Sequence, residues 1–111
     1  MKQSHTAVVE RKEEFTDQLQ THPYEVAWAS EAIFFLRVEE LSGESPELDA
    51  AVQISVDGVN WVDEGTKLGP VCEEGDYFAK VSHFGGWLRL SGEVRGENAR
   101  FVLTVQLVLK E

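Results

Sequence analysis

The residues that could do chemistry gather in two short acidic segments. One follows the Asp57-Gly58 pair, and the other covers 73–76 and holds three more carboxylates. Calcium prefers carboxylate and amide oxygens, and the first segment offers them from Asp57, Asn60, Asp63 and Glu64. Neither segment has the alternating ligands and sixth-position glycine of an EF-hand loop. The alternative is that Asp57 makes a hydrogen bond within its own turn while the other acids are solvated. We therefore expect no cofactor, with calcium as the alternative.

Nucleophilic catalysis is not indicated by the sequence. Cys72 is the only cysteine, so no disulfide can form within the chain, and the histidine nearest to it is His83. His5, His22 and His83 show none of the short spacings typical of a metal site. A lone cysteine in a β protein is most often a small buried hydrophobe or an inert loop residue. The sequence predicts that the protein is not an enzyme.

Aromatic side chains offer a different chemistry, because their faces stack on the apolar faces of sugars and the indole N–H adds directional polarity. The candidates for such a carbohydrate site are Trp61, Tyr77, Trp87, Asp57, Asn60 and Asp63, with Trp28 and Tyr24 as further rings. The alternative is that these rings pack in the core. Arg89, which stands between two leucines, is expected to point away from the core and to pair with an acid on the neighbouring strand.

These residues lie in and between short segments with the pattern of β-strands. Val52, Ile54 and Val56 alternate with two polar residues, the period of a strand with one buried face, and Asp57-Gly58 supplies a turn after it. The predicted strands are 32–41, 48–56, 61–62, 76–84, 87–94 and 99–110. Glycine-containing turns at 42–46, 57–58, 74–76, 85–86 and 95–98 separate them, which is typical of a sandwich or a small barrel.

The same alternation predicts which side chains face the core. The inward residues are expected to be Phe34, Leu36, Val38, Leu88, Leu90, Phe101, Leu103, Val105, Leu107 and Leu109. The opposite face of the last strand is also more apolar than a solvated face. We therefore expect that strand to be central in its sheet or covered by a neighbouring subunit.

The first 31 residues are less regular. Their pattern favours two strands, 6–12 and 15–20, followed by an extended segment over 24–28, and these form either part of the sandwich or an arm. A helix over 9–19 is the competing interpretation, because Phe15 and Leu19 lie four residues apart.

Length and charge narrow the class of protein. A chain of 111 residues is long enough for one core, so we predict a single domain over 1–111, an all-β antiparallel sandwich of jelly-roll type with about eight strands. The formal charge of −10 repels nucleic acids and anionic membranes. The longest apolar run, 32–36, is far shorter than the ~20 residues of a membrane span. Residues 1–5 lead into no signal-peptide core, so no secretion signal is expected.

The order of several motifs resembles that of small virion proteins of tailed phages and prophages. The segments LSGESPELDAAVQISVDGVNWVDEG and FGGWLRLSGEVRGENARFVLTVQLVLK carry the resemblance. A Gly-x-Ser-Pro turn at 43–46 is followed by a Ser-x-Asp-Gly-x-x-Trp hairpin at 55–61, a Trp-Leu-Arg strand at 87–89, a second glycine turn at Gly96 and a final Leu-x-Leu-Lys strand end at 107–110. The residues of this motif set are Ser55, Asp57, Gly58, Trp61, Trp87 and Arg89, to which the resemblance gives a structural role.

The hairpin motif alone is similar to one in discoidin-like, galactose-binding sandwiches, although this chain is shorter and lacks their terminal cysteines. The resemblance to virion proteins implies a non-enzymatic structural or accessory protein that decorates a capsid or belongs to a tail. It implies assembly with itself, as a trimer or dimer, and with a capsid or tail protein. The expected location is the virion, or the cytoplasm during assembly. A carbohydrate-binding module, with or without calcium, is the alternative.

Overall fold

Every regular element of the computed structural model, which describes residues 3–111, is a β-strand. The strands are β1 (Ser4–Phe15), β2 (Gln18–Gln20), β3 (Tyr24–Glu25), β4 (Glu31–Ser55), β5 (Val62–Val71), β6 (Gly75–Ser82) and β7 (Trp87–Lys110). Residues 1 and 2, the start of the predicted domain, lie outside the described part. The described residues contain no helix that could cross a membrane.

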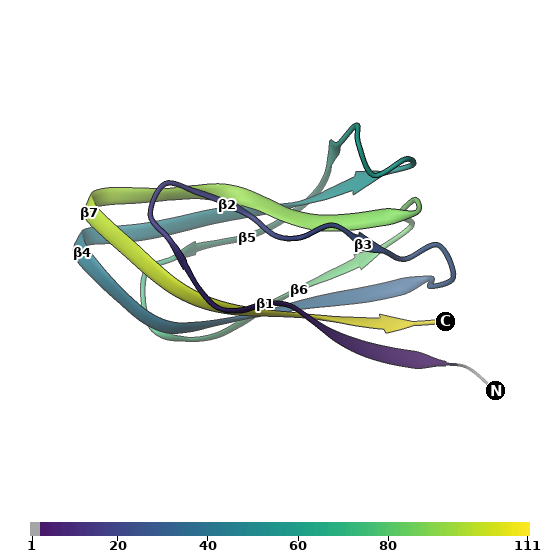
Figure 1. Cartoon of the computed structure of the whole chain (residues 1–111), viewed down its shortest axis with the longest axis horizontal. Coiled ribbons are helices and arrows are strands. Elements are labelled where there is room, and N and C mark those ends of the chain that lie inside the picture. The colour runs from purple at the N-terminus through teal and green to yellow at the C-terminus, as the bar shows by residue number, and fades with distance from the viewer. Residues whose placement is uncertain (1–2) are drawn as a thin grey trace.

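Two long strands, β4 and β7, form the frame of the molecule. They pair antiparallel from Glu31 opposite Lys110 to Ser55 opposite Trp87, and both fold over near their middle (Figure 1). Each long strand therefore contributes one half to each of two layers. The second half of β7 and the first half of β4 lie between β1 and β6, which we call the β1 layer. The other halves lie between β5 on one side and β2 and β3 on the other, which we call the β5 layer.

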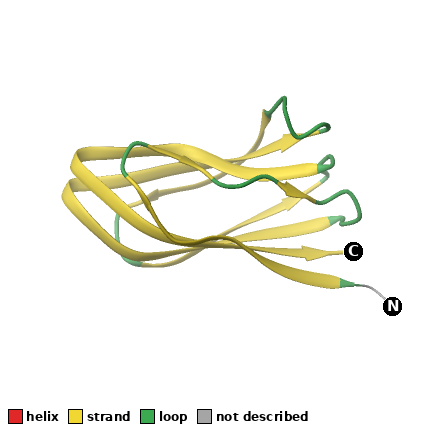
Figure 2. Ribbon diagram, viewed as in Figure 1, coloured by secondary structure: helices red, strands yellow, loops and turns green. Residues whose placement is uncertain are grey.

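With β2 and β3, which follow each other along the same half of β7, counted as one, each layer has four strand segments, and their order is that of a jelly roll. The predicted all-β antiparallel sandwich is confirmed. Loops join the strands at both ends of the elongated molecule (Figure 2). The end where β4 and β7 fold over is called the bent end. The opposite end carries the connections 26–30, 56–61 and 83–86, the start of β1 and the end of β7, and is called the loop end (Figure 1).

The bent end corrects the prediction of separate strands divided by turns at 42–46 and 95–98. There the pairing of β4 with β7 shifts register but continues, so the glycines bend the strands instead of ending them. Gly43 has a φ of 110°, and a Cβ on it would lie 2.6 Å from the carbonyl oxygen of Asn98. A glycine is required here both by its backbone conformation and by the close approach of the facing strand.

The core lies between the layers and contains all of the side chains that alternation predicts. Each predicted inward residue of β4 and β7 is buried, from Phe34 to Leu109. The last strand is central, as one of the two expectations had it, because β7 lies between β1 and β4. Its outer face includes Val102, which is also buried.

Other details of the strand predictions were wrong. The alternation fails after Ile54, since Ser55 is only 4% exposed whereas Val56 is 86% exposed. The two strands favoured over 6–12 and 15–20 are present, with other bounds, as β1 and β2, and the competing helix over 9–19 is absent. Trp61 and Val62 were expected to be a short strand, whereas β5 extends from Val62 to Val71.

Candidate functional site

The Asp57 turn is held by hydrogen bonds made within the loop. The Asp57 Oδ1 atom accepts the backbone N–H groups of Asn60 and Val59, both at 2.9 Å, and the hydroxyl of Ser55 at 2.9 Å. The Asn60 amide donates to Oδ2 at 2.9 Å. These bonds, with the Asn60 N–H first among them, hold the pKa of Asp57 well below its usual range. The carboxylate therefore serves to fix the turn.

The predicted motif residues form one continuous structural unit at the loop end. The hydroxyl oxygen of Ser55 accepts the N–H groups of Asp57 and Gly58, at 3.2 and 2.8 Å, which explains why Ser55 is buried although it is polar. Gly58 has a φ of 80°, and a Cβ on it would lie 3.1 Å from the ring of Trp87. A side chain at Gly58 would press on that ring, so the turn and the start of β7 are fitted to each other.

Arg89 and Trp61 complete this unit through a partner that differs from the predicted acid. The residue directly opposite Arg89 on β4 is Gln53, so the Nε of Arg89 donates to the Gln53 Oε1 atom at 2.8 Å. Gln53 in turn donates to Asp63 at 2.9 Å. The guanidinium carbon of Arg89 lies 4.3 Å from the centre of the Trp61 ring, which is a cation–π arrangement. Partial burial lowers the pKa of Arg89.

The three rings predicted to form one sugar platform do not lie together. Tyr77 belongs to β6, in the β1 layer, and its hydroxyl donates to the carbonyl of Glu73 at 2.9 Å. Trp61 and Trp87 flank the Asp57 turn at the loop end, where one is covered by Arg89 and the other contacts Gly58. The side chain of Asn60 donates a hydrogen bond to Asp57, and that of Asp63 accepts one from Gln53. Tyr77 therefore lies apart from the other five candidates, and ligand binding by the set stays a prediction.

The second acidic segment is likewise dispersed. Asp76 pairs with Arg37 across β6 and β4, with 2.7 Å between Nε and Oδ1, and this partner lowers the pKa of Asp76.

Cys72 is exposed, and His83 lies in the β6–β7 connection with a φ of 58°. Within residues 3–111, no three side chains of His, Cys, Asp or Glu come together as metal ligands.

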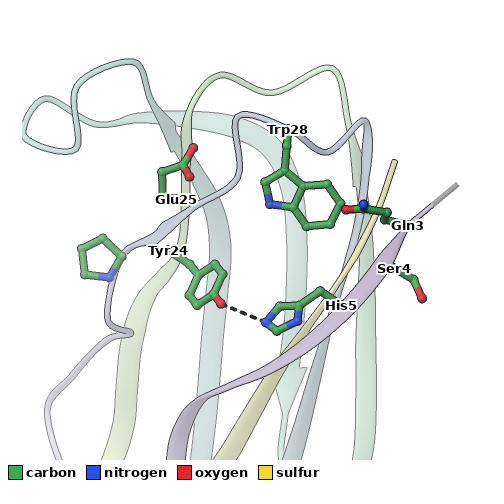
Figure 3. Close-up of a pocket in the computed structure, with 7 residues that line it drawn as sticks. Gln3, Ser4, His5, Tyr24, Glu25 and Trp28 are labelled. Atoms are coloured by element: carbon green, nitrogen blue, oxygen red, sulfur yellow. Dashed lines mark hydrogen bonds between the residues drawn. The ribbon is translucent and has the colours of Figure 1, made fainter.

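A hollow at the loop end brings Tyr24 and Trp28, which the sequence named as further rings of a sugar site, together with residues that it did not associate with them (Figure 3). It lies between the start of β1 and β3, the edge strands of the two layers. Its lining residues are Gln3, Ser4, His5, Pro23, Tyr24, Glu25 and Trp28. The Nε2 of His5 and the hydroxyl of Tyr24 are hydrogen-bonded at 3.1 Å, and the two rings are stacked with centroids 6.3 Å apart. Only the pairing of both strands with β7 brings these two residues together.

A second surface that the sequence did not indicate lies on the outside of the β1 layer. Val8, Phe35 and Phe78 stand in one row across it, because Gln106 of β7 faces both Val8 and Phe35, and Phe35 faces Phe78. The three side chains are 40%, 40% and 59% exposed. We call this row the phenylalanine face. Alternation from the inward Phe34 predicts that Phe35 points outward, but the row itself depends on the register of four strands.

Basic side chains surround the phenylalanine face. Five of the ten lysines and arginines of this acidic chain line the shallow depressions on either side of the row, namely Arg11, Lys12, Arg37, Lys80 and Lys110. Ile33 and Val108, both half-buried, extend the apolar surface toward Lys80. The outside of the β1 layer is therefore apolar at its centre and charged at its margin, where these bases outnumber the acids Glu31, Glu39 and Asp76.

One buried carboxylate ties β1 to the segment after β2. The side chain of Glu10 is 5% exposed, and its Oε2 atom accepts both the backbone N–H of His22 at 2.9 Å and the Nδ1–H at 2.6 Å. The hydrogen bond and the charge of Glu10 raise the pKa of His22. This pair explains how an acid is accommodated inside the sandwich, and it is structural.

Comparison with known proteins gives likeness of fold. No family model matches the sequence, and no curated protein matches it. The SPBc2 prophage-derived protein YomS has a similar structure, with a TM-score of 0.59 and 12% identity over 100% of this chain and 96% of YomS. The structure of infectious bursal disease virus, Gx strain, is similar with a TM-score of 0.58 and 12% identity, over 98% of this chain and 32% of that one. The jelly roll found here thus also occurs in a prophage-derived protein and in a virus.

Proposed function

We propose that the chain is a non-enzymatic structural or accessory protein of a virion, which decorates a capsid or forms part of a tail. In this role it assembles with copies of itself, as a trimer or dimer, and with a capsid or tail protein. The observation that carries the proposal is the phenylalanine face, a row of exposed apolar side chains on an ordered sheet surface. The end-to-end likeness of fold to a prophage-derived protein of similar length supports the choice of a virion.

The energetic argument concerns the two phenylalanine rings. Burial of apolar surface yields about 25 cal/mol for each Å² removed from water. Phe35 and Phe78 lie side by side with ring centres 6.2 Å apart, so one contact would cover both. A flat sheet surface with an apolar centre and a charged margin is the usual anatomy of a subunit interface. Such a surface favours assembly as the function of this β-sandwich.

Edge strands beside the face offer a second means of contact. Among the described strands, β1 pairs only with β7, and β6 pairs only with β4. In the part of the chain that the structure describes, the β1 layer therefore has, on each side of its exposed row, one strand edge that pairs with no other strand. A neighbouring subunit can add backbone hydrogen bonds at such an edge.

The first prediction is that the wild-type chain is oligomeric at tens of micromolar and that its interface includes the phenylalanine face. Changing both Phe35→Glu and Phe78→Glu should weaken self-association by at least 100-fold, or about 2.7 kcal/mol. Multi-angle light scattering after size-exclusion chromatography measures the mass, and circular dichroism checks that the variant is folded.

Val59→Glu is the matched control, because Val59 is 76% exposed in the loop after Asp57 and lies away from the β1 layer. It should leave the oligomer intact. A wild-type protein that is a strict monomer at high concentration would count against assembly. Immunogold labelling of purified particles then distinguishes shell from tail, and particles without label would contradict the virion role.

A further inference from the structure

We infer that the hollow between β1 and β3 is a binding site for a neutral pyranose sugar. This inference goes beyond the assembly role and does not depend on it, because the hollow shares no lining residue with the phenylalanine face. It uses Tyr24 and Trp28, the two further rings named from the sequence, and none of the main candidates Trp61, Tyr77 and Trp87. The surface is built from a ring exposed at the rim, a second ring behind it and polar groups of both hydrogen-bonding kinds (Figure 3).

Trp28 supplies the exposed ring. It is 40% exposed, although Val26, two residues before it, is fully buried. The connection that carries it is held at three points: the Val26 N–H donates to Gly86 at 2.6 Å, the Ala29 N–H to Val26 at 3.0 Å, and the Ser30 N–H to Lys110 at 2.9 Å. The indole is thus presented from an anchored turn. A ligand that stacks on the indole therefore loses little binding free energy to ordering of the loop.

Tyr24, which is half-buried, and His5, which is exposed, form one wall of the hollow. Tyr24 pairs with Leu88 and His5 with Leu109, so each is positioned by a different half of β7. Their hydrogen bond of 3.1 Å and their stacked rings join the edges of the two layers. This wall is therefore formed before a ligand arrives, as is usual for small-molecule sites.

Polar groups lie around the rings. The Oε2 atom of Glu25 accepts the N–H of Ala27 at 2.7 Å, which fixes the carboxylate at the rim. The side-chain amide of Gln3 lies beside Trp28 in the same hollow, and it can both donate and accept hydrogen bonds (Figure 3).

This mixture of groups decides the class of ligand. Sugar hydroxyls donate and accept at the same time, and the C–H face of a pyranose ring stacks on an indole. A cation could also lie against these rings, but it would leave the donors of Gln3 and of the Tyr24 hydroxyl without a partner, and this hollow offers a single carboxylate. A neutral pyranose matches both the rings and the polar groups.

The test uses the full chain with the methyl glycosides of glucose, galactose, mannose and N-acetylglucosamine. Saturation-transfer-difference NMR detects binding, and titration of backbone amide shifts locates it. We expect at least one glycoside to bind saturably and to shift the amides of 3–5 and 23–28. Trp28→Ala should weaken this binding at least tenfold, and Tyr24→Phe should weaken it less, because only the hydroxyl is lost.

Trp61→Ala is the matched control, a second tryptophan at the loop end that lies outside the hollow, and it should leave the affinity unchanged. Three results would overturn the inference: none of the four glycosides binds, the Trp61 variant loses binding as the Trp28 variant does, or a lysine peptide binds at the hollow in preference to the glycosides. Loss of folding in the Trp28 variant is checked by circular dichroism. Glu25→Gln, which leaves the loop sequence around Trp28 intact, provides a second variant with an expected loss of several-fold.

Discussion

Asp57 illustrates, at the scale of single residues, how one carboxylate can suit two roles in a sequence. An aspartate in an acidic loop fits a cation site, and an aspartate before a glycine fits a turn. Here the donors come from Ser55, Val59 and Asn60, all within three residues of it. The local role could therefore be predicted from the sequence. The sequence could not show that the Ser55 side chain points inward. Alternation from Val52 and Ile54 predicts the opposite, and the pattern breaks because β4 ends at Ser55.

The second prediction follows from the lowered pKa of Asp57. A carboxylate whose pKa is depressed in the folded state stabilises that state above its unfolded pKa of about 3.9, and this contribution is lost as the pH falls through the folded pKa. Asp57→Ala should lower the melting temperature by a constant amount between pH 5 and 8, and the difference from wild type should shrink below pH 4. Thermal unfolding followed by circular dichroism measures it.

Asp57→Asn serves as the companion variant, since it keeps one acceptor oxygen for the loop N–H groups but cannot ionise. It should retain part of the stability and show no such change in acid. A difference between wild type and Asp57→Ala that stays constant down to pH 2.5 would contradict a role for the ionised carboxylate.

At the scale of elements, the two long strands show what the positions of glycine-containing segments can and cannot predict. Glycine with Ser or Asn marks turns, and it equally marks a strand that folds over while its pairing continues. The segments at 43–46 and 95–98 face each other in the bend, and only the pairing across 50 residues of sequence distinguishes the two outcomes. β5 was largely missed because Gly65 and the Gly69-Pro70 pair interrupt its pattern. The phenylalanine face and the hollow could not be predicted because both depend on the register between strands that are distant in the sequence.

The third prediction tests the close approach at the bend. Gly43→Ala should lower the free energy of unfolding by about 2 kcal/mol more than Gly65→Ala, because an extra methyl group in a packed site typically costs about 1–3 kcal/mol. Gly65 is the matched control: its φ of 113° is close to that of Gly43, but its missing Cβ would meet nothing within 4 Å. Urea denaturation measures both. Equal losses would mean that backbone strain alone accounts for the effect.

Charge is the property that matters most at the scale of the whole molecule. Each copy carries a formal charge of −10 and measures 47 × 27 × 19 Å. The screening length is about 30 Å at 10 mM salt and about 8 Å at 150 mM. In dilute salt, two copies therefore repel each other over most of their length, whereas in physiological salt only the groups near the contact interact.

The fourth prediction is that salt strengthens self-association. If apolar burial at the phenylalanine face drives the contact, raising sodium chloride from 10 to 150 mM should lower the dissociation constant several-fold, because the repulsion is screened while the apolar term persists. Sedimentation equilibrium at both concentrations measures this. Weaker association in higher salt would instead indicate a contact made by ion pairs between the basic margin and acidic side chains of the neighbour.

The central position of β7 has a consequence for the time at which the protein can fold. Its two halves supply an inner strand to each layer, and its partners β1 to β4 all precede it in the chain. During synthesis those strands emerge from the ribosome with their main partner still missing, so neither layer can close while 87–110 remains in the exit tunnel. The sandwich can therefore close only after 87–110 has left the tunnel, and until then the strands made earlier stay exposed to contact with one another.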